Sequence, residues 1–246
     1  MSDVTNDVRI NIATCCKSLR LRRLTTNLDL VKELDPERFL LGLLELEVSH
    51  RTQSRIDRNI KQAGFYTRKT FDDFSFDEVT LPSSLSREDL EALSFIDNRQ
   101  NLILYGNVGT GKTHLATALG VLACQKGKKV AFYRTASLVT RLVRLNKGGA
   151  LETFLKSLEK VDLIICDEWG YVPISREGAQ LLFQVVSACY ETKSIIITTN
   201  LEFSKWAPIF LDEAMTTAMI DRLIHHGQLL IFDGKSHRVQ QSLMRR

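Results

Sequence analysis

The feature that most constrains this chain is the segment Gly-Asn-Val-Gly-Thr-Gly-Lys-Thr at residues 106–113. An apolar run over residues 101–105 precedes it, and residues 113–126 carry leucines at helical spacing after it. A strand, a glycine-rich loop and a helix in this order form a phosphate-binding loop, because backbone amides and the positive helix end attract phosphate oxygens. The segment therefore predicts nucleotide binding within an α/β fold.

Each residue type in this loop has an expected task. Glycines let the backbone approach the phosphates, Lys112 reaches the β- and γ-phosphates, and the Thr113 hydroxyl is expected to bind Mg²⁺. The residues expected to contact the nucleotide form one stretch: Gly106, Asn107, Val108, Gly109, Thr110, Gly111, Lys112, Thr113 and His114.

A second apolar run, residues 161–166, ends in Asp167 and Glu168. Ligands of parallel sheets gather at the carboxyl ends of the strands, so these carboxylates are candidates for the same site. Asp167 is expected to hold Mg²⁺ together with Thr113, and Glu168 to activate water against the γ-phosphate. Two solvated acids at a strand end are the alternative.

Asn200 follows a third apolar run at residues 194–199. If this strand neighbours the one before the phosphate loop, Asn200 lies beside the carboxylates, where AAA+ ATPases keep a sensor that positions water. A simple turn residue after a strand is the alternative.

The composition places the chain among soluble cytoplasmic proteins with no membrane partner. Its net charge of +4 and pI near 8.8 favour an anionic partner, and no apolar run approaches the ~18 residues of a membrane span. The 5 cysteines lack Cys-x-x-Cys spacing and are expected to be reduced thiols. His225 and His226 have no further ligands at metal spacing and are interpreted as helix-end residues.

The chain is expected to contain three parts. Residues 1–66 form a helical N-terminal domain, helical throughout from about residue 8, with a helix starting at Pro36; residues 67–100 form a connector. Residues 101–246 form the ATPase core, in which strands near 101–105, 129–133, 161–166, 194–199 and 228–232 alternate with helices. That alternation predicts a five-stranded parallel sheet covered on both faces. No C-terminal helical lid is expected.

Two basic sets are candidates for contact with the DNA backbone. The first recurs at helical spacing near the end of the N-terminal part: Arg51, Arg55, Arg58 and Lys61. The second lies between the second and third core strands: Arg134, Arg141, Arg144 and Lys147. Phosphate contact needs no base reading, but an ordinary solvated face is an equal alternative for each set.

Several segments, taken in order, resemble one family. They are GNVGTGKTHLA, DLIICDEWGYVPI, ITTNLEFSKWAPIF and MTTAMIDRLIHH, followed by a closing strand with GKSHR. The chain is similar over nearly its whole length to the IstB-like ATP-binding proteins, which help transposition in one insertion-sequence group. These are related to DnaC-type helicase loaders and belong to the AAA+ class.

The resemblance implies an ATP- and Mg²⁺-dependent ATPase that binds double-stranded DNA as a homo-oligomer. It would assemble on target DNA, remodel it, and recruit or stimulate a cognate transposase. Arg222 falls where AAA+ subunits present an arginine finger to a neighbour's ATP, with a surface pair between Asp221 and Arg222 as the alternative. Arg238 falls on a family motif and is a further candidate for phosphate contact.

Two other functions stay open. A helicase loader of DNA replication would use the same chemistry with another partner. A P-loop small-molecule kinase would need an acceptor-binding lid, and the glutamate that follows Asp167 favours water as the acceptor instead.

Overall fold

The computed structural model describes residues 2–21, 23–32 and 35–240, and the chain divides into two compact units, residues 1–58 and 59–246. The boundary falls inside helix α2 (Pro36–Ala63). The expected domain limits at residues 66 and 100 stay a prediction.

The first unit contains helix α1 (Ser2–Ser18) and most of α2. As predicted, α2 begins at Pro36, and the carboxylate of Asp35 accepts a hydrogen bond from the Arg38 amide at 3.1 Å. The prediction of continuous helix was wrong between the two helices, where the described residues form turns. The reason is a small core in which Leu24, from this turn segment, is buried with Cys16 and Leu43.

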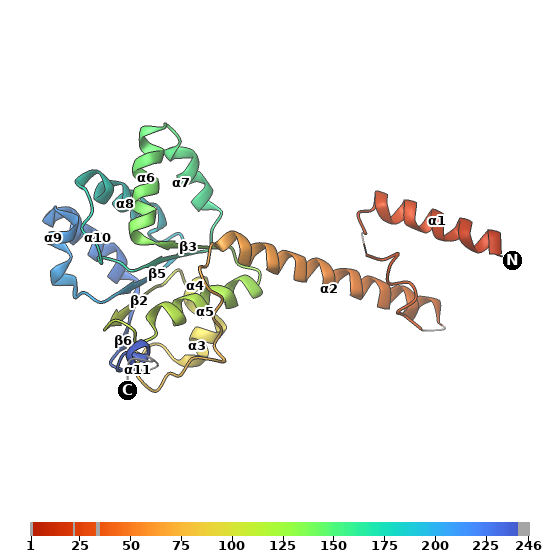
Figure 1. Ribbon diagram of the computed structural model, residues 1–246, viewed down its shortest axis with the longest axis horizontal. Coiled ribbons are helices and arrows are strands. Elements are labelled where there is room, and N and C mark those ends of the chain that lie inside the picture. The colour runs from red at the N-terminus through yellow and green to blue at the C-terminus, as the bar shows by residue number, and fades with distance from the viewer. Residues whose placement is uncertain (1, 22, 33–34, 241–246) are drawn as a thin grey trace. The chain divides into compact units, whose positions relative to one another are not determined.

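The second unit is built on one sheet, which within the described residues has six strands in the order β1-β6-β2-β5-β4-β3 (Figure 1). Their bounds are β1 (Val79–Thr80), β2 (Asn101–Gly106), β3 (Val130–Arg134), β4 (Leu163–Asp167), β5 (Ser194–Thr199) and β6 (Gly227–Phe232). All neighbouring pairs are parallel except β1, which pairs with β6 antiparallel. The predicted five strands are present, and β1 is an addition.

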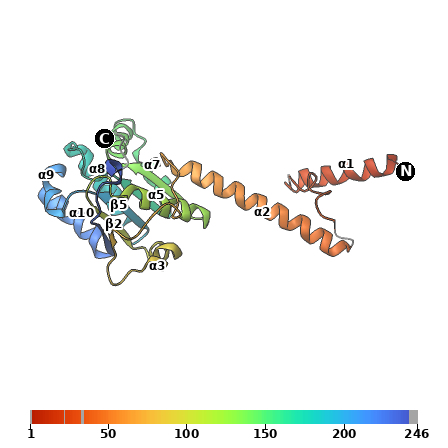
Figure 2. The same ribbon diagram turned by 60° about the horizontal axis from the view of Figure 1, so that its bottom comes forward.

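Helices cover both faces of this sheet (Figures 1 and 2). Besides the end of α2, the described part of this unit contains the helices α3 (Arg87–Ala92), α4 (Ser94–Asp97), α5 (Lys112–Gln125), α6 (Thr135–Lys147), α7 (Leu151–Glu159), α8 (Arg176–Cys189), the 3₁₀ turn η1 (Phe203–Lys205), α9 (Ala207–Phe210), α10 (Glu213–His225) and α11 (His237–Gln240).

Alternating residues of each buried strand face opposite layers. In β4, Leu163 and Ile165 join the core that contains α5, whereas Ile164 and Cys166 join the core that contains α6, α8 and α10. Because side chains alternate along a strand, a run buried on both faces reads as continuously apolar. The expected α/β core with helical layers on both faces is therefore confirmed.

The sheet order determines at which edge of the sheet a binding site can form. Strand β5 lies between β2 and β4 and is parallel to both, so the segments that follow these three strands emerge at the same edge. Among the described helices, none has the length and apolar character needed to cross a bilayer.

Candidate nucleotide-binding site

The phosphate loop joins β2 to α5 with a backbone that only glycine adopts readily. Gly111 directly precedes α5 with φ of +99°, and Gly106 has φ of +153°. A β-carbon on Gly106 would overlap the carbonyl oxygen of Phe232. The glycines thus fix the turn that aims amides and the N-terminus of α5 at a phosphate.

Lys112 is half-buried in this loop, and its ammonium lies against the loop's own backbone. Its Nζ donates hydrogen bonds to the carbonyl oxygen of Gly106 at 2.7 Å and to that of Asn107. Burial lowers the pKa of Lys112 to about 8; nearby Asp167 opposes this shift and Arg238 adds to it. A phosphate group would supply the countercharge that this ammonium needs.

Asp167 is buried at the carboxyl end of β4, with only 3% of its surface exposed. One carboxylate oxygen, Oδ1, accepts hydrogen bonds from the hydroxyls of Thr113 at 2.7 Å and Thr198 at 2.5 Å. The first of these bonds joins β4 to the phosphate loop. A hydroxyl and a carboxylate in contact are the hard oxygen donors that Mg²⁺ prefers, so these residues fit that ion.

Glu168 leaves the strand in a left-handed conformation, with φ of +59°, which is costly for a residue with a side chain. The conformation is held by Thr198, whose hydroxyl accepts from the Glu168 amide at 3.0 Å and whose carbonyl accepts from the Trp169 amide at 2.8 Å. The turn leaves the Glu168 carboxylate about half exposed, 3.8 Å from the guanidinium Nε of Arg134 at the end of β3. Arg134 in turn lies 4.3 Å above the Tyr66 ring.

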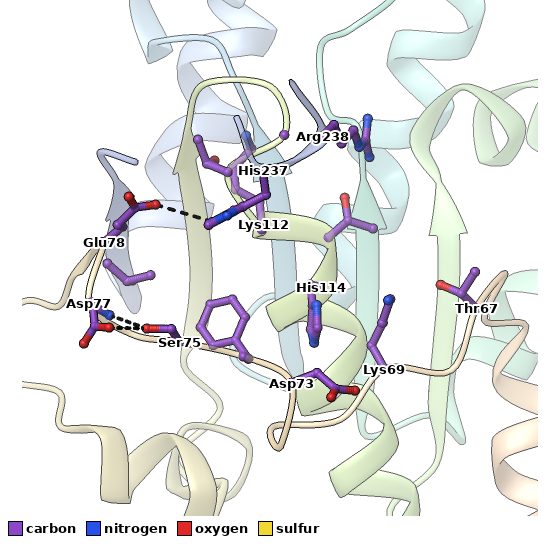
Figure 3. A pocket seen from close by; sticks show the side chains of 16 residues that line it. Thr67, Lys69, Asp73, Ser75, Asp77, Glu78, Lys112, His114, His237 and Arg238 are labelled. Atoms are coloured by element: carbon purple, nitrogen blue, oxygen red, sulfur yellow. Dashed lines mark hydrogen bonds and ion pairs between the residues drawn. The ribbon is translucent and has the colours of Figure 1, made fainter. Parts of the chain in front are cut away.

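A cavity of about 740 Å³ opens beside the phosphate loop, large enough for a nucleotide (Figure 3). The connector forms one wall, with Lys69, Asp73 and Phe74, and the segment after β6 contributes His237 and Arg238. The two walls meet where the His237 ring and the Glu78 carboxylate lie 3.4 Å apart.

Two further contacts fix the walls of this cavity. His114 contacts the connector, since its Nε2 lies 3.0 Å from the carbonyl oxygen of Thr70. The His237 amide donates to the carbonyl oxygen of Gly109, which ties the segment after β6 to the phosphate loop.

The structure brings most of the predicted nucleotide-binding residues together. Asn200 follows a strand that is next to theirs in the sheet. It is partly exposed and directly follows β5, the strand between those that carry Gly106 and Asp167. The condition under which it would lie near the carboxylates is therefore met, while its role as a water sensor stays a prediction.

Arg222 lies on α10 and packs against the neighbouring helix α8. Its guanidinium carbon is 4.9 Å from the Phe183 ring centroid, and its Nη1 donates to the carbonyl oxygen of Ala218 at 2.9 Å. No ion pair links it to Asp221 within the described residues, so that alternative finds no support. An arginine finger at this position stays a prediction.

The first basic set divides into two kinds of residue. Arg51 makes contacts within the first unit: it donates to Glu47 Oε1 at 2.8 Å and to the carbonyl oxygen of Arg20 at 2.6 Å. Arg55 and Arg58 are exposed on the same helix. Lys61, also exposed, belongs to the second unit.

In the second basic set, Arg134 ends β3 and the other three residues lie on α6. Arg141 stacks over the Phe154 ring of α7 at 4.6 Å, and Arg141 and Arg144 line a shallow hollow of about 350 Å³. Lys147 is exposed at the last position of the helix. DNA contact by either set stays a prediction.

The sequence reasoning missed Thr198, Glu78 and His237 as parts of this site. The sequence did contain a signal for Thr198, because a threonine in a buried strand needs a hydrogen-bond partner. Glu78 and His237 had none, since each matters only through a partner far away in the chain.

Comparison with known proteins agrees with this geometry. The profile of the family described as IstB-like ATP binding protein matches residues 18–244. A protein named as an ATP-binding protein of insertion sequence IS21 from Pseudomonas aeruginosa is 37% identical over 213 residues, covering 85% of this chain and 79% of the relative. Its counterpart for insertion sequence IS232 from Bacillus thuringiensis subsp. berliner is 33% identical, covering 89% and 95%.

Solved structures show the same fold at low sequence identity. The DnaC helicase loader superposes with a TM-score of 0.52 at 23% identity, covering 66% of this chain and 96% of that one. AMPPCP-bound DnaA from Aquifex aeolicus superposes with a TM-score of 0.56 at 21% identity, covering 72% and 54%. These superpositions confirm the predicted α/β fold of the P-loop core.

The family match extends from α1 to beyond the segment after β6 and so includes the whole cavity. It also includes the phosphate loop and the Asp167-Glu168 pair, the residues predicted to bind phosphate and to support hydrolysis. The chain is an ATPase, and it belongs to the family of IstB-like ATP binding proteins.

Proposed function

We propose that this chain is an ATP-dependent helper of DNA transposition. It binds double-stranded DNA, assembles on it and remodels it, and it recruits or stimulates a transposase. The relatives named as insertion-sequence proteins support the setting. The observation that carries the chemistry is the contact of buried Asp167 with Thr113 of the phosphate loop, directly beside the exposed carboxylate of Glu168.

In this proposal the chain's own residues divide the work of hydrolysis. Lys112 binds the β- and γ-phosphates, and Glu168 accepts the proton of the attacking water. Asn200 orients that water, and Arg222 of a neighbouring subunit stabilises the charge that develops on the γ-phosphate. Thr113 and Asp167 would hold Mg²⁺, which neutralises phosphate charge when bound.

We assign DNA contact to exposed basic side chains that make no ion pair or side-chain hydrogen bond within the described part of the chain. Arg55 and Arg58 meet that condition, whereas Arg51 already binds Glu47 and the Arg20 carbonyl. We therefore expect Arg51 to contribute mainly to the stability of the first unit. Lys61 and the α6 set Arg141, Arg144 and Lys147 are secondary candidates. Contacts of this kind bind phosphate without reading sequence.

The remaining parts of the proposal concern organisation. We infer a homo-oligomer assembled through the ATPase cores, because an arginine finger acts on a neighbour's nucleotide. We also infer a cytoplasmic protein with a helical N-terminal domain at residues 1–66, a connector at 67–100 and an ATPase core at 101–246.

A helicase loader is the second candidate, supported by the fold shared with the DnaC loader. The two functions differ in partner, so isolation of the full chain from cells together with its partner distinguishes them. A replicative helicase would select the loader, and an integrase-type transposase encoded next to this chain would select the transposition helper. A small-molecule kinase has less support, since Glu168 favours water as acceptor.

The direct test measures ATP turnover with and without duplex DNA, and strand transfer by the transposase with and without this chain. We expect DNA to stimulate turnover and the chain to stimulate strand transfer. Lys112→Ala provides the control, because it removes the cation that binds phosphate and should abolish both effects. Strand transfer unaffected by wild-type protein with ATP would refute the proposed helper role.

A further inference from the structure

A second cluster of chemically reactive side chains lies outside the nucleotide site. Glu191, His225 and His226 each offer one ligand atom, and these atoms all lie within 4.8 Å of one another. All three side chains are exposed to solvent. Along the chain the two histidines lack a third ligand at metal spacing, but folding brings Glu191 beside them. Their interpretation as helix-end residues agrees with their place at the end of α10.

The local backbone explains how adjacent histidines face the same point. On a regular helix, neighbouring side chains diverge by about 100°. His225 is the last residue of α10, but His226 leaves the helix with φ of −118° and ψ of 31°, and the two ring centroids are 4.2 Å apart. Glu191 sits in the turn between α8 and β5 with φ of +55°.

A buried hydrogen-bond network around Asn101 holds the end of α10 in place relative to the start of β5. The Asn101 amide donates to the carbonyl oxygen of His226 at 2.8 Å, and its side-chain Nδ2 donates to that of Leu223 at 3.1 Å. Its side-chain oxygen accepts from the Ile195 amide at 2.9 Å, at the start of β5. Asn101 is only 7% exposed, so the cluster rests on a fixed base.

Neighbouring residues also orient the side chains of this cluster. The Tyr190 hydroxyl lies 2.8 Å from His225 Nδ1, which leaves Nε2 of that ring available. His226 Nε2 lies 3.5 Å from Glu191 Oε1, and the Glu191 carbonyl oxygen accepts from Arg99 Nη1 at 3.0 Å. A histidine whose second nitrogen is bonded is the arrangement that orients an imidazole towards a metal.

We propose that Glu191, His225 and His226 form a surface site for one divalent transition metal ion of the zinc type. Two imidazoles and a carboxylate match the ligands that Zn²⁺ accepts, with a coordination position left for water or another donor. Imidazole ligands favour Zn²⁺ over Mg²⁺ or Ca²⁺, so the site differs in chemistry from Thr113 and Asp167.

The site also differs in position from the nucleotide site. His226 and Glu191 precede β6 and β5, at the amino ends of the parallel strands, whereas the phosphate loop follows β2 at the carboxyl end. A bound ion would join the turn before β5 to the end of α10. We expect it to stabilise the folded ATPase unit, because a ligand that binds only the native state raises its stability.

The test uses the full-length, nucleotide-free protein and Zn²⁺ alone, with binding measured by isothermal titration calorimetry. We expect wild-type protein to bind one Zn²⁺ at this cluster and to melt at a higher temperature with Zn²⁺ than without. Glu191→Gln, His225→Ala and His226→Ala should each weaken that binding at least about tenfold and remove the thermal shift. Tyr190→Phe, which removes only the hydroxyl at His225 Nδ1, should weaken it by about tenfold or more.

His50→Ala is the matched control, because His50 lies on α2 outside the cluster and its removal should leave Zn²⁺ affinity unchanged. Co²⁺ in place of Zn²⁺ distinguishes the proposed ligands from the exposed thiol of Cys15, since a thiolate would add a sulfur-to-cobalt charge-transfer band. Retention of wild-type Zn²⁺ affinity in the Glu191, His225 and His226 variants would overturn the proposal, as would a thiolate band. Dichroism of each variant establishes that it is folded.

Discussion

Replacing Thr198 with valine tests the structural basis of the Asp167-Glu168 turn. The Thr198 hydroxyl donates to Asp167 Oδ1 at 2.5 Å and accepts from the Glu168 amide at 3.0 Å. Valine keeps the branched shape but removes both hydrogen bonds. Thr198→Ser is the matched control, because it keeps the hydroxyl and loses only a methyl group.

The expected cost follows from the two lost bonds. A hydrogen bond to a charged group contributes about 1.5–3 kcal/mol, and an amide left without an acceptor costs about 1 kcal/mol more. Thr198→Val should therefore lower the free energy of unfolding by about 2.5–4 kcal/mol at neutral pH. ATP turnover should fall as well, because Asp167 and Glu168 both lose the group that positions them.

Urea unfolding followed by tryptophan fluorescence measures this change in the relevant unit alone. The 2 tryptophans, Trp169 and Trp206, are both fully buried and both lie in the unit of residues 59–246. The urea midpoint should fall for Thr198→Val with an unchanged slope. If Thr198→Val unfolded within about 0.5 kcal/mol of Thr198→Ser, the hydroxyl would not be holding the turn.

Three further predictions concern charges. The pKa of Lys112 is about 8 in the free protein, and a bound phosphate would restore the charge of its ammonium. Nucleotide binding should therefore take up a proton at pH 9, and the affinity should fall as the pH rises through about 8. Calorimetry in buffers of different ionisation enthalpy measures the proton uptake. Arg55→Ala with Arg58→Ala should reduce the slope of log DNA affinity against log salt by about two. Mixed Arg222→Ala and Lys112→Ala proteins should hydrolyse ATP faster than the sum of the separate proteins, by lending an intact finger to an intact pocket.

Each of these three predictions would be contradicted by one experimental result. Absence of proton uptake at pH 9 would mean that Lys112 is already fully charged in the free protein. An unchanged slope of log DNA affinity against log salt would mean that Arg55 and Arg58 are ordinary solvated residues that do not contact DNA. If mixed oligomers form but hydrolyse ATP no faster than the sum of the separate proteins, Arg222 has only a structural role through its packing against Phe183.

The parts of the site that were predictable are those encoded locally. The phosphate loop fixes its own neighbours, since a strand must end at Gly106 and a helix must begin near Lys112. The strands that lead to Asp167 and Asn200 are buried on both faces and therefore contain apolar runs, at residues 163–166 and 195–197. Their limits in the structure differ from the expected ones by at most a few residues.

The parts that were not predictable depend on distant pairing. Strand β1 has two residues, too few for any periodicity, and forms through the pairing of Val79 with Phe232. The contact between Glu78 and His237 follows from that pairing and has no local signal. The turns between α1 and α2 were also missed, because burial of Leu24 between distant helical segments outweighs local helix preference.

We propose that ATP, bound through Lys112 and Asp167 and hydrolysed with Glu168 as the base, controls assembly on DNA. The most direct test measures binding of Glu168→Gln protein to fluorescent duplex DNA by anisotropy, with and without ATP and Mg²⁺. Because this variant keeps the proposed phosphate and metal ligands but lacks the proposed base, we expect ATP to produce a stable complex that does not turn over. Lys112→Ala should form no such complex. DNA binding by Glu168→Gln that is the same with and without ATP would contradict the account.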